Sequence, residues 1–85
     1  MTFLTNIKTA QDLADEAKQV LDKQEHEWVK SELKIVDLQI SLHLTDDHRA
    51  THTLEDWKRY ARDLRDYTSE VDGVVTVNAE VRPAI

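Results

Sequence analysis

Cysteine is absent from the chain, which excludes disulfide bridges, thiolate catalysis and zinc sites with cysteine ligands. Glycine and proline occur once each, at Gly73 and Pro83. A phosphate-binding loop or a dinucleotide-binding fingerprint needs several glycines, so neither can form here. No apolar run approaches the roughly 20 residues of a membrane-spanning helix, and no basic segment followed by an apolar stretch stands at the N-terminus. We therefore expect a protein that stays where it is made.

Basic side chains are also scarce. The 85 residues carry 17 acidic and 11 basic side chains, a net charge of −6, and no segment has a basic excess. Because nucleic-acid affinity depends largely on neutralising phosphates with Lys and Arg, we predict that the chain binds no nucleic acid. The same charge balance disfavours anionic membrane surfaces, so we predict no membrane binding. A chain this short predicts a single domain, residues 1–85.

One long helix is predicted over residues 10–44. Thr9, followed three residues later by Asp12, resembles a capping box, and helix-favouring residues continue as far as a polar loop. One alternative is a break near residues 25–27 that folds the N-terminal third back as a separate helix, since helices of about 8 to 20 residues are the norm. A second alternative is a strand over residues 36–44, where apolar and polar residues alternate.

A second helix is predicted over residues 54–69. Thr53, with Asp56 three residues later, repeats the capping-box pattern in front of a new apolar periodicity. Beyond this helix an Asp-Gly pair at 72–73 predicts a turn, and valines favour extended backbone. Residues 70–85 are therefore predicted to form a turn and a short extended tail.

The predicted first helix has apolar residues on two sides. At 100° per residue, one stripe occupies the C-terminal half and matches the second helix in length. Its members are Val29, Leu33, Val36, Ile40 and Leu44. We expect this stripe to pack against the second helix, which gives a mainly α fold: an antiparallel helical hairpin with a long first helix and a short extended C-terminal tail.

The other stripe lies within an arc of about 120° on the opposite side of the first helix. Its larger members are Leu13, Val20, Leu21, Trp28, Ile35, Leu38 and Leu42. No predicted element covers this stripe, and an uncovered run of such side chains is a solubility liability. We therefore predict that it binds a protein partner, a second copy of the chain in a homo-oligomer, or both.

Patterns for catalysis and metal binding are weak. His48 and His52 lie four residues apart beside Asp46 and Asp47, but the set has no thiolate and no His-Glu pattern on a helix. Polar loop residues are the preferred interpretation. No serine sits on a glycine-flanked elbow, and no acidic pair stands out as a general acid and base. We predict a protein that is not an enzyme and has no metal site and no cofactor.

Aromatic and charged residues are densest between residues 57 and 67 of the second predicted helix. Trp57 and Leu64 have the spacing of core residues. Four others fit either a core with a solvated surface or a recognition patch, because aromatics and arginine are enriched at interface hot spots. They are Tyr60, Arg62, Arg65 and Tyr67.

Seven residues of the second helix and the tail form an ordered pattern: Trp57, Tyr60, Leu64, Arg65, Asp66, Arg82 and Pro83. A Trp, a Tyr and a Leu-Arg-Asp run on one helix, followed by a short tail ending in Pro, resemble the C-terminal domain of the tail assembly chaperones of tailed bacteriophages. Residues 28–33, Asp37, 43–47 and 49–51 are similar to the first helix and loop of the same family. The resemblance covers about residues 26–83.

This resemblance implies a small phage protein that assists tail or tail-fibre assembly, without enzymatic activity or cofactor, in the cytoplasm of the infected bacterium. Together with the uncovered stripe, it predicts a chaperone that binds and shields apolar surface of a tail component during virion assembly. The alternative is a small structural protein that associates with itself and remains in the virion.

Overall fold

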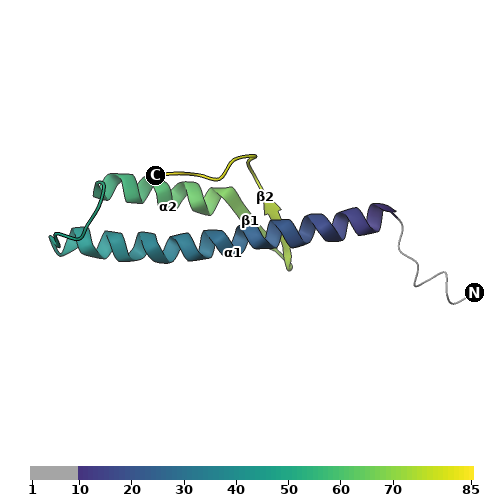
Figure 1. The fold of residues 1–85 in the computed structure, drawn as a ribbon, viewed down its shortest axis with the longest axis horizontal. Helices are drawn as coiled ribbons and strands as arrows, with labels where there is room; N and C mark the ends of the chain where they lie inside the picture. The colour runs from purple at the N-terminus through teal and green to yellow at the C-terminus, as the bar shows by residue number, and fades with distance from the viewer. Residues whose placement is uncertain (1–9) are drawn as a thin grey trace, which may run out of the picture.

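The computed structural model describes residues 10–85, with side chains from residue 13 onwards. Two helices and two short strands follow in the order α1 (Ala10–Leu44), α2 (Leu54–Tyr67), β1 (Thr68–Val71) and β2 (Val74–Val77). Figure 1 shows α2 beside the C-terminal part of α1, and the strands crossing α1 closer to its N-terminus. The described chain is mainly helical, and its first helix is long, as predicted.

α1 is an uninterrupted helix of 35 residues, about 50 Å long at 1.5 Å per residue. The alternative with a break near residues 25–27 is wrong, and so is the alternative of a strand over residues 36–44. No glycine or proline interrupts the helix. Near residues 25–27, Glu25 accepts a hydrogen bond from Tyr67, and His26 bonds to Thr68 of β1. These contacts hold this part of α1 in place. The N-terminal cap predicted for α1 lies outside the described residues.

α2 begins with the predicted capping box. The Thr53 hydroxyl accepts a hydrogen bond from the Asp56 N–H at 3.0 Å, and the Asp56 carboxylate accepts one from the Thr53 N–H at 3.3 Å. The helix ends at Tyr67, two residues before the predicted end. Thr68 is already extended, with φ −128° and ψ 153°, and begins β1.

The predicted extended tail needs a correction, because residues 68–77 form a β-hairpin. β1 and β2 pair antiparallel, with Val71 opposite Val74. The turn residues Asp72 and Gly73 both have positive φ, 52° and 78°, the combination that a two-residue turn between twisted strands requires. The Asp-Gly turn was predicted from the sequence, whereas the pairing of the strands on either side of it was not.

The core lies between α1 and α2. From the stripe predicted to face α2, Val29 and Val36 are buried, and Leu33 and Ile40 pack against them. Leu44 is 68% exposed, contrary to the prediction, because it ends α1 where the chain turns into the loop. From α2 the core receives Trp57, Tyr60, Ala61, Leu64 and Tyr67.

The β-hairpin is fastened to the N-terminal half of α1. Gln19 makes both hydrogen bonds to the Val75 backbone: its Nε2 donates to the carbonyl at 2.9 Å, and its Oε1 accepts from the N–H at 3.3 Å. His26 Nδ1 lies 2.8 Å from the Thr68 hydroxyl. The amide of Gln19 thus takes the place that a third strand would occupy at the outer edge of β2.

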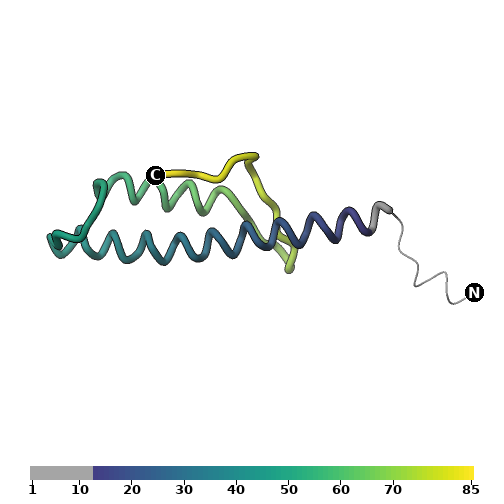
Figure 2. The backbone as a smooth tube through the Cα atoms, in the orientation of Figure 1, coloured from purple at the N-terminus to yellow at the C-terminus, as the bar shows by residue number. Residues whose placement is uncertain are grey.

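The tail after β2 is anchored to the end of α2. The Asn78 N–H donates to the Tyr67 carbonyl at 2.7 Å, and Asn78 Nδ2 donates to the Asp66 carbonyl at 3.0 Å. Figure 2 shows the tail turning beyond this point and running back along α2. This course brings Arg82 to the side of α1.

Candidate functional site

One face of α1 carries large apolar side chains that meet solvent. α2 lies along α1 (Figure 1) and packs against Val29 and Val36, and the residues of this other face stay exposed. Five members of the predicted partner-binding stripe are between 49% and 61% exposed, namely Leu13, Val20, Leu21, Ile35 and Leu38. We call these five residues the apolar face. That a partner binds them stays a prediction.

The two other members of that stripe, Trp28 and Leu42, are half-buried. For Trp28 the expectation of an uncovered side chain is wrong, because the tail and α2 cover it. The Arg82 guanidinium lies over its ring, 4.5 Å from the centroid, and the Tyr67 ring packs edge-on with 6.0 Å between centroids. Trp28 therefore separates an N-terminal from a C-terminal part of the apolar face.

The contact over Trp28 belongs to a cluster of four residues, Glu25, Trp28, Tyr67 and Arg82, which we call the tail clasp. Arg82 donates to both carboxylate oxygens of Glu25, from Nε to Oε1 at 2.8 Å and from Nη2 to Oε2 at 2.6 Å. The Tyr67 hydroxyl donates to the same Oε1 at 2.8 Å. Because these residues come from α1, α2 and the tail, the clasp joins three segments of the chain.

The tail clasp changes the acidity of its members. The hydrogen bonds from Arg82 and then from Tyr67 lower the pKa of Glu25 from 4.5 to about 2. Burial, reinforced by the neighbouring carboxylate, raises the pKa of the Tyr67 hydroxyl. The bond to Glu25 raises the pKa of Arg82. At neutral pH, Glu25 is therefore an acceptor, and Tyr67 and Arg82 are donors.

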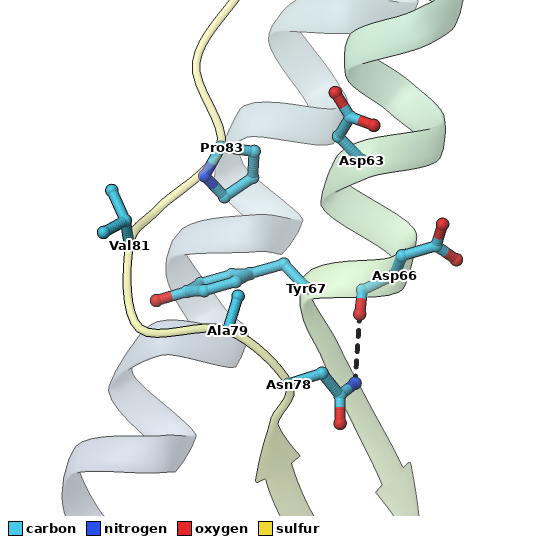
Figure 3. A pocket seen from close by; sticks show the side chains of 7 residues that line it. All are labelled: Asp63, Asp66, Tyr67, Asn78, Ala79, Val81 and Pro83. Atoms are coloured by element: carbon cyan, nitrogen blue, oxygen red, sulfur yellow. Dashed lines mark hydrogen bonds between the residues drawn. The ribbon is translucent and has the colours of Figure 1, made fainter.

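An open hollow of about 300 Å³ lies beside the tail clasp. Figure 3 shows the tail curving around the Tyr67 ring, with the Asn78 amide bonded to the Asp66 carbonyl below it. The hollow is lined by Asp63, Asp66, Tyr67, Asn78, Ala79, Val81 and Pro83. Asp63 already accepts a hydrogen bond from Arg59 at 2.7 Å. The hollow follows from the curve of the tail and shows no pairing of acid and base.

Three of the residues that carry the family resemblance, Trp57, Tyr60 and Leu64, are buried between the helices. The burial of Trp57 and Leu64 confirms the core prediction. Trp57 Nε1 donates to the Thr51 carbonyl at 2.7 Å and so fixes the loop that precedes α2. Burial and the Glu32 carboxylate raise the pKa of Tyr60. For Tyr60, the core alternative therefore holds.

The remaining residues of the resemblance lie at the surface. Arg65 and Asp66 are exposed on α2, and so is Arg62. Arg82 belongs to the tail clasp, while Pro83 is half-buried at the hollow. The seven residues therefore divide between the core and the carboxyl-terminal surface, and do not form one continuous patch.

Asp47 and His52 of the loop, and His43 at the end of α1, have structural partners. Asp47 accepts hydrogen bonds from the Arg49 N–H at 2.8 Å and from its guanidinium at 3.0 and 2.8 Å. His43 Nε2 lies 2.7 Å from the Thr51 carbonyl, and the His52 ring packs edge-on against Trp57. In the described part of the chain, no three His, Asp or Glu side chains gather as a metal site would need.

Sequence reasoning did not find Glu25, the centre of the tail clasp. Its only local signal is its position one helical turn before Trp28, and Glu-x-x-Trp is a common spacing on a helix surface. Arg82 approaches from 57 positions away, at a point that depends on the β-hairpin. The partner of Glu25 could therefore be found only in three dimensions.

Comparison with known proteins adds no relative. No family model, no curated protein and no solved structure matches the chain. None of the described helices combines the length and the apolar character that crossing a membrane demands. What the protein does must therefore be inferred from the apolar face, the tail clasp and the sequence resemblance.

Proposed function

We propose that the protein is a phage tail or tail-fibre assembly chaperone, a non-enzymatic protein that acts in the cytoplasm of the infected bacterium. It binds apolar surface of a tail component and shields it until the tail is built. The observation that carries this proposal is the apolar face of α1. The proposed fold for this function is an antiparallel helical hairpin. In it, α2 packs against the C-terminal half of α1 on the side away from the apolar face.

The apolar face is long enough to serve as a binding surface. From Leu13 to Leu38 it follows α1 for roughly 38 Å at 1.5 Å per residue. Fully burying one such side chain contributes about 1.5 to 3 kcal/mol, and each is already partly covered, so five of them contribute about 5 kcal/mol on binding. Association itself offsets a large part of this gain through lost translational and rotational freedom. We therefore expect a reversible complex, as release of the tail component requires.

Co-expression with the tail and tail-fibre proteins of the same phage genome tests the proposal. The wild-type chain should increase the fraction of one of these proteins that stays soluble. Leu38→Asp places a charge in the apolar face, where it would have to be desolvated on binding, and should abolish the increase. The measured quantity is the soluble fraction after centrifugation.

Ser41→Asp is the matched control, because it adds the same charge at another exposed position on the same helix, outside the apolar face. It should keep the solubilising effect. Circular dichroism must show the helical content of the wild type in both variants. A folded Leu38→Asp variant that solubilises the tail protein as well as the wild type does would contradict the proposal.

The alternative, a self-associating structural protein of the virion, draws on the same apolar face. A second copy could cover it, since a long straight helix suits helix–helix packing. Mass spectrometry of purified virions separates the two functions. A chaperone is absent from the finished particle, whereas a structural protein is present in stoichiometric copies.

A further inference from the structure

The tail clasp consists of a fixed part and a movable part. Glu25 and Trp28 lie on α1 and Tyr67 ends α2, and the shared core holds these helices together. Arg82 lies on the tail, where the neighbouring Val81 is 77% exposed. The three residues on the helices therefore keep their arrangement if the tail leaves, while Arg82 leaves with it.

The fixed part matches the chemistry of a guanidinium group. Glu25 accepts two parallel hydrogen bonds from Arg82, a pairing that suits a planar guanidinium and that an ammonium cannot reproduce. The face of the Trp28 ring attracts the cation above it. The Tyr67 hydroxyl bonds to Glu25 from the protein side and orients the carboxylate independently of Arg82.

Solvent reaches this arrangement. The side chain of Arg82 is 51% exposed and that of Glu25 is 24% exposed. Another guanidinium can therefore approach the carboxylate while Arg82 moves away. The carboxylate does not depend on Arg82 for its charge, because even the ordinary Glu25 pKa of 4.5 lies below the pH of a cell.

We propose that Glu25, Trp28 and Tyr67 form a binding site for an arginine side chain of a partner protein, and that Arg82 occupies this site as an internal, displaceable ligand. The site goes beyond the chaperone function and does not depend on it. Displacement of Arg82 releases the tail from Trp28, which lies between the two parts of the apolar face. A partner that brings its own arginine would therefore take the place of the tail over Trp28, between the two parts of the apolar face.

Competition between the tethered and the added arginine provides the test. A ligand on a short tether acts at an effective concentration in the millimolar range. Removing it with Arg82→Ala leaves the site vacant. The probe is an acetylated peptide Val-Arg-Pro-Ala-Ile, the sequence of residues 81–85, titrated while the Trp28 indole N–H is followed by NMR. We expect a Kd of about 1 mM for Arg82→Ala and binding about threefold to tenfold weaker for the wild type.

Two controls identify the guanidinium. The same peptide with citrulline or lysine in place of arginine should bind Arg82→Ala at least about tenfold more weakly, because neither side chain supplies a charged fork. Adding Glu25→Gln to Arg82→Ala should weaken binding of the arginine peptide to a similar extent. Arg65→Ala, which removes an exposed arginine outside the clasp, should behave as the wild type does.

The proposal is overturned if Arg82→Ala binds the arginine and citrulline peptides equally, or if Glu25→Gln leaves the affinity unchanged. Should Arg82→Ala fail to fold, Arg82→Lys takes its place, because lysine keeps the positive charge but loses the forked pairing and competes less well. Leu38→Asp leaves the clasp intact and should bind the peptide as the wild type does. A failed chaperone function therefore shows in the soluble fraction of the tail protein, and a failed arginine site shows in peptide binding.

Discussion

Arg82 and Glu25 stand 57 positions apart in the sequence and form a forked ion pair that fastens the tail to α1. Tyr67 donates to the same carboxylate, so α1, α2 and the tail meet at one acidic side chain. Because the Arg82–Glu25 contact is an ion pair, and because a protonated carboxyl group accepts hydrogen bonds less well, the contact is strongest while Glu25 is ionised. Its strength should therefore depend on pH.

We expect the free energy of unfolding to fall as the pH is lowered from about 4.5 to about 2. The pKa of Glu25 is about 2 in the folded protein against an ordinary value of 4.5, so the unfolded chain takes up this proton first. The stabilisation is fully present above the ordinary pKa and is lost as the pH falls through the folded value. Urea denaturation at a series of pH values measures it.

Glu25→Gln isolates this contribution from other carboxyl groups, such as Asp47, whose pKa is also lowered. The variant should be less stable than the wild type at pH 6, and the difference should shrink as the pH approaches 2. Stability curves of the two proteins that run parallel down to pH 2 would show that the clasp does not contribute as described.

Leu64→Ala should lower the free energy of unfolding by about 2 to 5 kcal/mol, because it opens a cavity at a fully buried position in the core. Leu38→Ala is the matched control, since it removes the same atoms from a residue that is 58% exposed. Its effect should stay within about 0.5 kcal/mol. Urea denaturation followed by circular dichroism gives both values, and equal losses would contradict the assigned core.

Gln19→Ala should loosen β2 from α1. The substitution removes both side-chain hydrogen bonds to the Val75 backbone, and each such bond is worth about 1 kcal/mol net. We expect the Val75 amide to exchange with deuterium about tenfold faster in an NMR experiment. Gln24→Ala, at an exposed position farther along α1, should leave that rate unchanged. An unaltered rate in Gln19→Ala would show that another contact protects β2.

The helices could be predicted from the sequence because their signals are local. The capping box at Thr53 and Asp56 fixes the start of α2, and the absence of glycine and proline keeps α1 continuous. The helical arrangement of apolar residues also separates buried Val36 from exposed Leu38. Each of these features depends on neighbours within a few positions, which a single sequence displays.

The β-hairpin and the tail clasp could not be predicted in the same way. The turn at Gly73 was visible, but strands of four residues give too short an alternation to indicate that they pair. Trp28 was assigned to the uncovered stripe because nothing in its vicinity shows that Arg82 returns to cover it. Contacts between segments so far apart depend on the path of the whole tail.

The order of α1 and α2 along the chain has a consequence for synthesis on the ribosome. When α1 has emerged and α2 has not, Val29 and Val36 face water together with Leu38, and the nascent helix is apolar on both sides. α2 can cover one of these sides only after Leu64 has been synthesised. A ribosome that adds about 5 to 20 residues per second reaches Leu64 about 1 to 4 s after Leu44. During those seconds the nascent α1 exposes the most apolar surface, and aggregation with other nascent chains on neighbouring ribosomes is favoured.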